Sequence, residues 1–165
     1  MRLLVSDKNI LMDWEAAGRL QTLFGWGATL VVPDVLFAQE LGSRAARLTE
    51  LGLQVLELDE RGVRRVATLA QRYRGPSRID LFALALAERQ ACVLLTGDKA
   101  LRSAATSENV EVHGTLWLGE RMVEAGVLDV EGLRVAFEAM CGRGRRLPQA
   151  EIDALLTRLG PAPRP

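Results

Sequence analysis

The chain has 165 residues, of which 48% are hydrophobic and 25% charged, and its 21 Lys plus Arg balance 21 Asp plus Glu. This length and composition indicate one globular domain, and the zero net charge excludes a strongly basic nucleic-acid coat and an acidic disordered tail protein. One histidine and two cysteines are too few for an ordinary zinc site or a disulfide framework. No targeting signal or membrane-spanning run is predicted, so we expect a cytoplasmic protein with no membrane contact.

In the first half of the chain, short apolar runs alternate with segments of helical periodicity. The pattern predicts a buried strand over residues 3–5 and a helix over 9–23, which the sequence Gly-Trp-Gly then breaks. A second strand over 29–32 precedes Pro33, which suits the start of a helix over 34–48. A third strand is predicted at 53–58 and is followed by a helix over 59–73 that ends before Gly75 and Pro76.

The second half continues this alternation and contains the most apolar helix of the chain. That helix spans residues 77–90, and its run from 81 to 87 leaves almost no polar face, so we expect it to be buried. The pattern then predicts strands at 92–95 and 110–112 and helices at 99–105, 115–125, 129–140 and 148–159. The alternation predicts an α/β fold with a mostly parallel central sheet and additional C-terminal helices.

Four carboxylates occupy positions where acidic residues need an explanation. Asp7 and Asp98 follow predicted strands, and parallel α/β sheets bind ligands beyond the carboxyl ends of their strands. Asp80 opens the most apolar helix, and Glu40 follows apolar residues by one helical turn. Since buried acids are usually paired or bound to a metal, these four form a candidate site.

Each of the four acids also has a structural interpretation. Asp7 and Asp98 are good helix N-caps, and Asp80 forms a capping box with Ser77. Glu40 is consistent with a solvated helix residue that pairs with Arg44. The functional interpretation therefore depends on the combination of the four acids, in their order along the chain.

In that order the sequence resembles the PIN domain family of metal-dependent ribonucleases. The resemblance covers about residues 3–127 and rests on four segments, VSDKNILMD (5–13), VPDVLFAQEL (32–41), SRIDLFALALA (77–87) and LLTGDKALR (94–102). It implies a three-layer α/β/α fold and a site in which the acids Asp7, Glu40, Asp80 and Asp98 are catalytic and bind metal. Asn9, Ser77 and Thr96 are the side chains expected to support these acids. Lys99 and Arg102 stand where some members carry further acids, and Lys8 where the family residue is often small.

The residue types agree with this chemistry independently of the family. Clustered carboxylates repel one another, and a site made only of oxygen ligands selects Mg²⁺ or Mn²⁺. Such an ion polarises a phosphodiester and activates water. We expect Lys8, Lys99 and Arg102 to contact RNA phosphates, whereas the arginines of residues 61–74 are expected to form a solvated helix face.

The expected organisation is a PIN-like nuclease domain over residues 1–127, a helical extension over 128–160 packed on the same domain, and a loose tail over 161–165. The resemblance further implies the toxin component of a toxin–antitoxin pair of the VapC kind, a homodimer whose partners are an RNA substrate and a small antitoxin. The alternatives are an RNA-processing nuclease outside such a pair, a non-catalytic PIN-like binding module and a receiver-like signalling domain.

Overall fold

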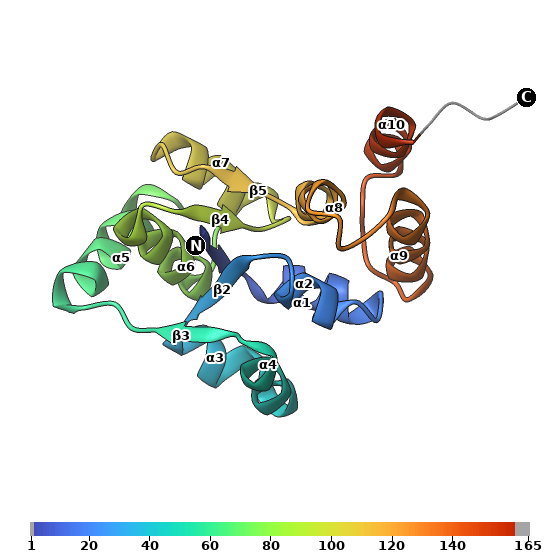
Figure 1. The fold of residues 1–165 in the computed structure, drawn as a ribbon. Helices are drawn as coiled ribbons and strands as arrows, with labels where there is room; N and C mark the ends of the chain where they lie inside the picture. The colour runs from blue at the N-terminus through green and yellow to red at the C-terminus, as the bar shows by residue number, and fades with distance from the viewer. Residues whose placement is uncertain (1, 161–165) are drawn as a thin grey trace, which may run out of the picture.

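The computed structural model describes residues 2–160 and contains a five-stranded sheet of order β3-β2-β1-β4-β5 (Figure 1). All strand pairings are parallel. The predicted α/β class with a parallel central sheet is therefore confirmed. The strands are β1 (Arg2–Ser6), β2 (Ala28–Pro33), β3 (Gln54–Leu56), β4 (Val93–Leu95) and β5 (Val112–His113).

Helices cover both faces of the sheet because neighbouring strand residues point to opposite sides. Leu4 belongs to one apolar core and Val5 to the other. The first core is shared with helices α1 (Lys8–Ala16), α2 (Leu20–Phe24), α4 (Ala45–Leu51) and α8 (Thr115–Glu124). The second core is shared with α5 (Glu60–Arg72), α6 (Arg78–Gln90) and α7 (Lys99–Ser107). This is the expected three-layer α/β/α arrangement (Figure 1).

Helix α6 is the buried helix that its composition predicts. Its residues 81–87 are all buried, and they pack against the sheet and against α5. A helix that is apolar on nearly every side is stable only when other elements surround it. In this fold, α5, α7 and the sheet provide those surroundings.

Two helices predicted as continuous are interrupted in the structure. The segment expected as one helix over 9–23 forms α1 and α2, separated by Gly18, whose φ of +67° lies in the left-handed region. The segment expected over 34–48 forms α3 (Asp34–Glu40), a 3₁₀ turn η1 (Gly42–Arg44) and α4, with Gly42 at φ +53°. In both segments a glycine redirects the chain while the apolar periodicity continues past it.

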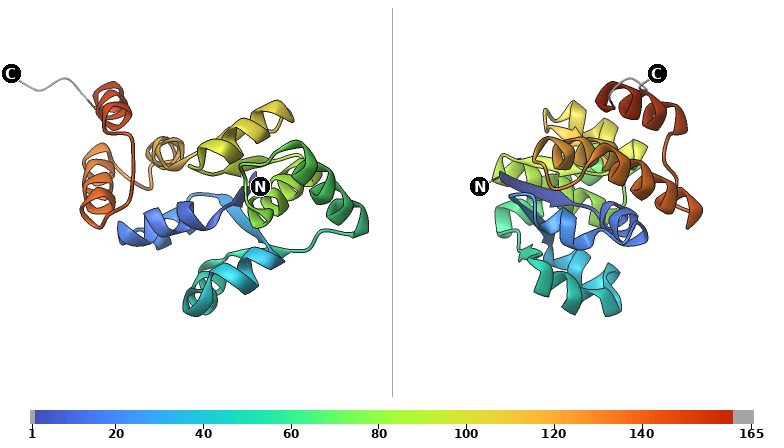
Figure 2. Two further views of the ribbon diagram at one scale, coloured as in Figure 1. Left: turned by 180° about the vertical axis from the view of Figure 1, so that it is seen from behind. Right: turned by 45° about the vertical axis from the view of Figure 1, so that its right-hand side comes forward.

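The C-terminal helices α9 (Val130–Gly142) and α10 (Gln149–Leu159) complete the first core. Phe137, Met140 and Ile152 are buried in the same cluster as Trp14 of α1. Both helices lie beside α8, away from the α5–α6 side of the molecule (Figure 2). The predicted tail over 161–165 lies outside the described residues. Between residues 2 and 160, no helix is long and apolar enough to span a membrane.

The strand order determines where a site is expected. The chain moves from β1 to β2 on one side, and β4 then pairs with the opposite side of β1, so the topology changes direction between β1 and β4. Ser6 pairs in register with Leu95, so the residues that follow them leave the sheet side by side. Such a switch point at the carboxyl edge is where open α/β sheets bind ligands.

Candidate active site

Asp7 is the most buried of the four predicted acids, with only 5% of its surface exposed. It is the N-cap of α1, and its Oδ1 accepts a hydrogen bond of 2.9 Å from the backbone N–H of Ile10. Its Oδ2 accepts a hydrogen bond of 2.5 Å from the hydroxyl of Thr96, the residue that follows β4. The carboxylate is therefore fixed at the switch point by contacts to two elements.

The surroundings of Asp7 disfavour its charge. Burial raises the pKa of Asp7 from 3.8 to about 6, and the nearby carboxylates of Asp80 and Asp13 act in the same direction. The hydrogen bonds from Thr96 and Ile10 oppose this shift only partly. The fold therefore holds a carboxylate whose negative charge a nearby cation would stabilise.

Thr96 links Asp7 to the loop that carries Asp98. Thr96 is fully buried, and while its hydroxyl donates to Asp7, its oxygen accepts the backbone N–H of Asp98 at 3.1 Å. Asp98 is exposed and caps α7 through a bond of 2.8 Å from the N–H of Leu101. Its Oδ2 accepts no hydrogen bond from the described residues. The predicted capping role and a ligand role are therefore compatible, since one oxygen stays available.

Asp80 approaches the same edge of the sheet from α6. The predicted capping box is present: Asp80 accepts the backbone N–H of Ser77 at 2.9 Å, and the Ser77 hydroxyl accepts the N–H of Asp80 at 3.1 Å. The carboxylate of Asp80 also lies close enough to Asp7 to raise the pKa of Asp7. Ser77 therefore orients the side chain of Asp80, as a supporting residue would.

Glu40 is the predicted acid with the fewest described contacts. It is half-buried at the end of α3, and among residues 2–160 its side chain has no hydrogen bond or ion pair. The expected pairing of Glu40 with Arg44 does not form, because Arg44 pairs with Glu15 of α1 at 2.9 Å. The 3₁₀ turn after α3 changes the helical register that would have brought Arg44 beside Glu40.

Two polar residues of this edge, Asp13 and Arg145, were not predicted. Asp13 is buried on α1, where its Oδ1 accepts the Nε–H of Arg145 at 2.7 Å and its Oδ2 accepts the hydroxyl of Thr115 at 2.6 Å. Arg145 also donates to the side-chain oxygen of Asn9 at 3.1 Å. Asn9 therefore contacts the C-terminal connector instead of an acid. Asp13 was recognisable as an acid within an apolar helix, but its partner lies 132 residues away.

Comparison with known families identifies this architecture. The family described as a PIN domain matches residues 3–161 of the chain. The chain belongs to the PIN domain family. PIN domains are generally nucleases and typically use divalent metal ions. This membership rules out the receiver-like alternative, and no curated protein matches the chain.

The PIN domain's acidic edge fits a hard cation in its chemistry, but it is not a complete protein cage. No three Asp, Glu, His or Cys side chains among residues 2–160 lie close enough to hold an ion by themselves. Mg²⁺ does not need such a cage, since it usually keeps several waters and binds through one or two carboxylates together with substrate phosphates. The buried Asp7, with Asp80 and Asp98 nearby, supplies donors of this kind.

The basic residues of the PIN domain divide into two groups. Lys8 and Lys99 begin α1 and α7, directly after Asp7 and Asp98, and Arg102 donates to the backbone oxygen of Thr96 at 3.0 Å. These three residues lie beside the acidic edge, and their contact with RNA phosphates stays a prediction.

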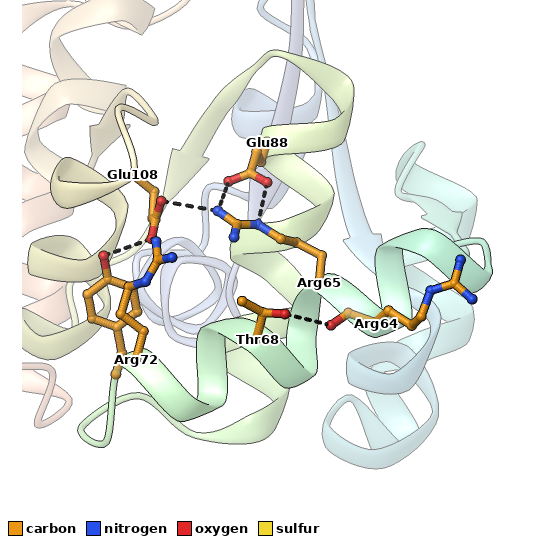
Figure 3. A network of polar contacts seen from close by, with 7 residues as sticks. Arg64, Arg65, Thr68, Arg72, Glu88 and Glu108 are labelled. Atoms are coloured by element: carbon orange, nitrogen blue, oxygen red, sulfur yellow. Dashed lines mark hydrogen bonds and ion pairs between the residues drawn. The ribbon is translucent and has the colours of Figure 1, made fainter.

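The arginines of α5 have structural partners instead (Figure 3). Arg65 forms ion pairs with Glu88 at 2.8 Å and with Glu108 at 3.1 Å, and Arg72 and Tyr73 also bond Glu108. The expectation of a solvated face holds for Arg64, which pairs with Glu60 on its own helix. For Arg65 and Arg72 it was incomplete, because the sequence does not show that α7 ends beside α5.

Proposed function

We propose that this PIN domain is a Mg²⁺- or Mn²⁺-dependent endoribonuclease that hydrolyses RNA phosphodiesters. The observation that carries the proposal is the buried carboxylate of Asp7 at the switch point, which is bonded through Thr96 to the loop of Asp98 and lies near Asp80. Asp7 has no cationic partner in the described residues. It accepts two hydrogen bonds, and the carboxylates of Asp80 and Asp13 raise its pKa, so a bound cation would offset the cost of its charge.

Each residue of the edge has a definite part in this activity. Asp7, Asp80 and Asp98 would hold the metal, and Glu40 is the fourth acid proposed for the site. When bound, the ion supplies charge stabilisation to the phosphodiester and lowers the pKa of bound water. Thr96 keeps Asp7 and the Asp98 loop at a fixed separation. Lys8, Lys99 and Arg102 bind the flanking phosphates and orient the RNA.

The test is replacement of Asp7 or Asp98 by Asn, which keeps the shape and the capping ability of the side chain. We expect Asp7→Asn and Asp98→Asn each to reduce metal-dependent cleavage of single-stranded RNA by at least about a hundredfold. Cleavage is measured by gel electrophoresis with Mg²⁺, with Mn²⁺ and with EDTA.

Asp129→Asn is the matched control for this experiment. Asp129 caps α9 as Asp98 caps α7, through a bond to the N–H of Gly132, but it lies outside the acidic edge. Its substitution should leave cleavage unchanged. Full activity in a purified Asp7→Asn/Asp98→Asn double variant would contradict the proposed site.

We further propose that the chain is the toxin of a toxin–antitoxin pair and acts as a homodimer that a small antitoxin blocks. The support for this role is the resemblance of its four motifs to the PIN domain family, which further implies a toxin of the VapC kind and with which its PIN membership is compatible. Expression of the wild type should arrest growth. Expression together with the neighbouring reading frame, which would encode the antitoxin of such a pair, should restore growth. RNA cleavage without growth arrest would favour an RNA-processing nuclease. RNA binding without cleavage would favour a binding module.

A further inference from the structure

A cleft of about 350 Å³ opens directly beside the acidic edge. One wall is formed by the end of β5 and the start of α8, and the other by the connector between α9 and α10. Gly97, which separates Thr96 from Asp98, lines the cleft and so joins it to the acidic edge. The walls include Gly97, Arg102, His113, Trp117, Arg146 and Glu151.

The connector wall is held in place by its own contacts. Arg145 bonds Asp13 and Asn9 on α1, and its backbone N–H donates to the carbonyl of Met140 at 3.0 Å. The side chain of Arg145 is therefore directed toward α1. Its neighbour Arg146 is exposed and borders the cleft. The cleft thus has a fixed position relative to the helix that Asp7 caps.

Charge and shape in this cleft match a nucleotide chain. Arg102 of α7 and Arg146 of the connector both line the cleft, and a guanidinium contacts phosphate oxygens through paired N–H donors. His113 stacks on Trp117 with ring centres 4.3 Å apart and planes within 5°, and the guanidinium groups of Arg2 and Arg121 lie over the Trp117 ring. The outer face of the His113 ring is therefore the aromatic surface that this stack leaves for a base in the cleft. Asp13 also lines the cleft, but Arg145 neutralises it. A volume of this size lies within the range of small-ligand pockets.

We propose that this cleft binds one flank of the single-stranded RNA substrate, with Arg102 and Arg146 on phosphates and the His113 ring, supported by Trp117, against a base. The inference rests on the ribonuclease function proposed above and assigns its substrate a path. A strand seated in the cleft passes Gly97 and continues directly to Asp98 and Asp7. An acidic peptide would use the two arginines but not the aromatic surface, so the features together favour RNA.

The test measures RNA binding separately from cleavage. In Mg²⁺, the Asp7→Asn variant of the whole 165-residue chain is titrated with a fluorescein-labelled mixed-sequence RNA of about twelve nucleotides, and anisotropy is followed at several KCl concentrations. Adding Arg146→Gln should weaken binding about tenfold, as expected for the loss of one charge-assisted contact. The slope of log K against log salt should become shallower by about 0.7.

Two further variants separate phosphate binding from a general effect of charge. Arg143→Gln removes an equally exposed arginine of the same connector that does not line the cleft, and it should leave affinity unchanged. Glu151→Gln removes a negative charge from the cleft and should strengthen binding. Unfolding would weaken RNA binding in both variants, so a weaker affinity in Arg146→Gln and a stronger one in Glu151→Gln would not result from unfolding.

The outcomes also distinguish this inference from the function on which it rests. If the wild type cleaves RNA and Arg146→Gln binds and cleaves as the wild type does, the cleft assignment alone is overturned. If the wild type neither binds nor cleaves RNA, both fall together. If Arg146→Gln loses binding of a labelled polyglutamate peptide but not of RNA, the cleft belongs to an acidic protein partner and the RNA assignment is overturned.

Discussion

At the scale of single residues, Asp7 is placed where folding and function make opposite demands. Burial favours its protonated form and raises its pKa to about 6, whereas metal binding requires the carboxylate. Because the folded protein binds this proton more tightly than the unfolded chain, protonated Asp7 stabilises the fold. That contribution is complete below about pH 4 and is lost as the pH rises to about 6. It amounts to at most about 3 kcal/mol.

The comparison of wild type with Asp7→Asn isolates this effect, since the other titrating groups are the same in both proteins. In EDTA, urea unfolding should show Asp7→Asn to be the more stable protein at pH 7.5, and the difference should vanish near pH 4. Mg²⁺ should stabilise the wild type at pH 7.5 and leave Asp7→Asn unchanged. A wild type as stable as Asp7→Asn at every pH would show that Asp7 carries no burial cost.

The same scale shows what sequence predicts and what it does not. Asp7, Asp80 and Asp98 were found because each follows a strand or opens a helix, and local sequence marks those positions. Thr96 was named through the resemblance to the PIN domain family. The bond from Arg145 to Asp13 was missed, because only tertiary packing brings the α9–α10 connector to α1.

At the scale of elements, the connector between α9 and α10 is attached to α1 through Arg145. The ion pair with Asp13 is largely shielded, with 28% of the Arg145 side chain and 10% of the Asp13 side chain exposed. Arg145→Ala would leave the Asp13 charge buried without its cation, so we expect a loss of about 2 kcal/mol in the free energy of unfolding. Hydrogen exchange in α10 should accelerate more than in α6.

A second substitution distinguishes loss of the ion pair from loss of packing. Asp13→Asn removes the buried charge, so Asp13→Asn/Arg145→Ala should be more stable than Arg145→Ala alone. Arg143→Ala, on the same connector, should unfold like the wild type. If the double variant loses the sum of the two single effects, the two residues do not interact energetically.

Helix boundaries illustrate another limit of sequence at this scale. The apolar spacing of residues 9–23 continues in phase across Gly18, so periodicity alone predicts one helix. The left-handed conformation at Gly18 is a property of the folded backbone, and it divides the segment into α1 and α2. Single glycines within an apolar pattern are therefore the places where such predictions most need a structure.

At the scale of the whole molecule, the parallel sheet was predictable because strands and helices alternate along the chain, and only a few topologies satisfy that alternation. The two edges of the sheet carry different groups of charged residues. Asp7, Thr96 and Asp98 lie at its carboxyl edge. Glu88 and Glu108 line a hollow with Arg2 and Cys92, at the amino ends of β1 and β4. This separation predicts that stability and catalysis respond to different substitutions.

Glu108 provides the test of that separation. It accepts bonds from Arg65, Arg72 and Tyr73, and only 10% of its side chain is exposed, so it joins α5 to the end of α7 (Figure 3). Glu108→Gln keeps the shape but removes the charge, and it should lower the free energy of unfolding by about 1–3 kcal/mol in urea titrations. Because Glu108 lies at the opposite edge from Asp7, RNA cleavage below the melting temperature should stay at the wild-type rate.

Asp7→Asn should show the reverse of Glu108→Gln, with stability kept or raised and cleavage lost. A parallel fall of cleavage and stability in Glu108→Gln would mean that the two edges are coupled through the sheet, because no contact of Glu108 reaches the acidic residues directly.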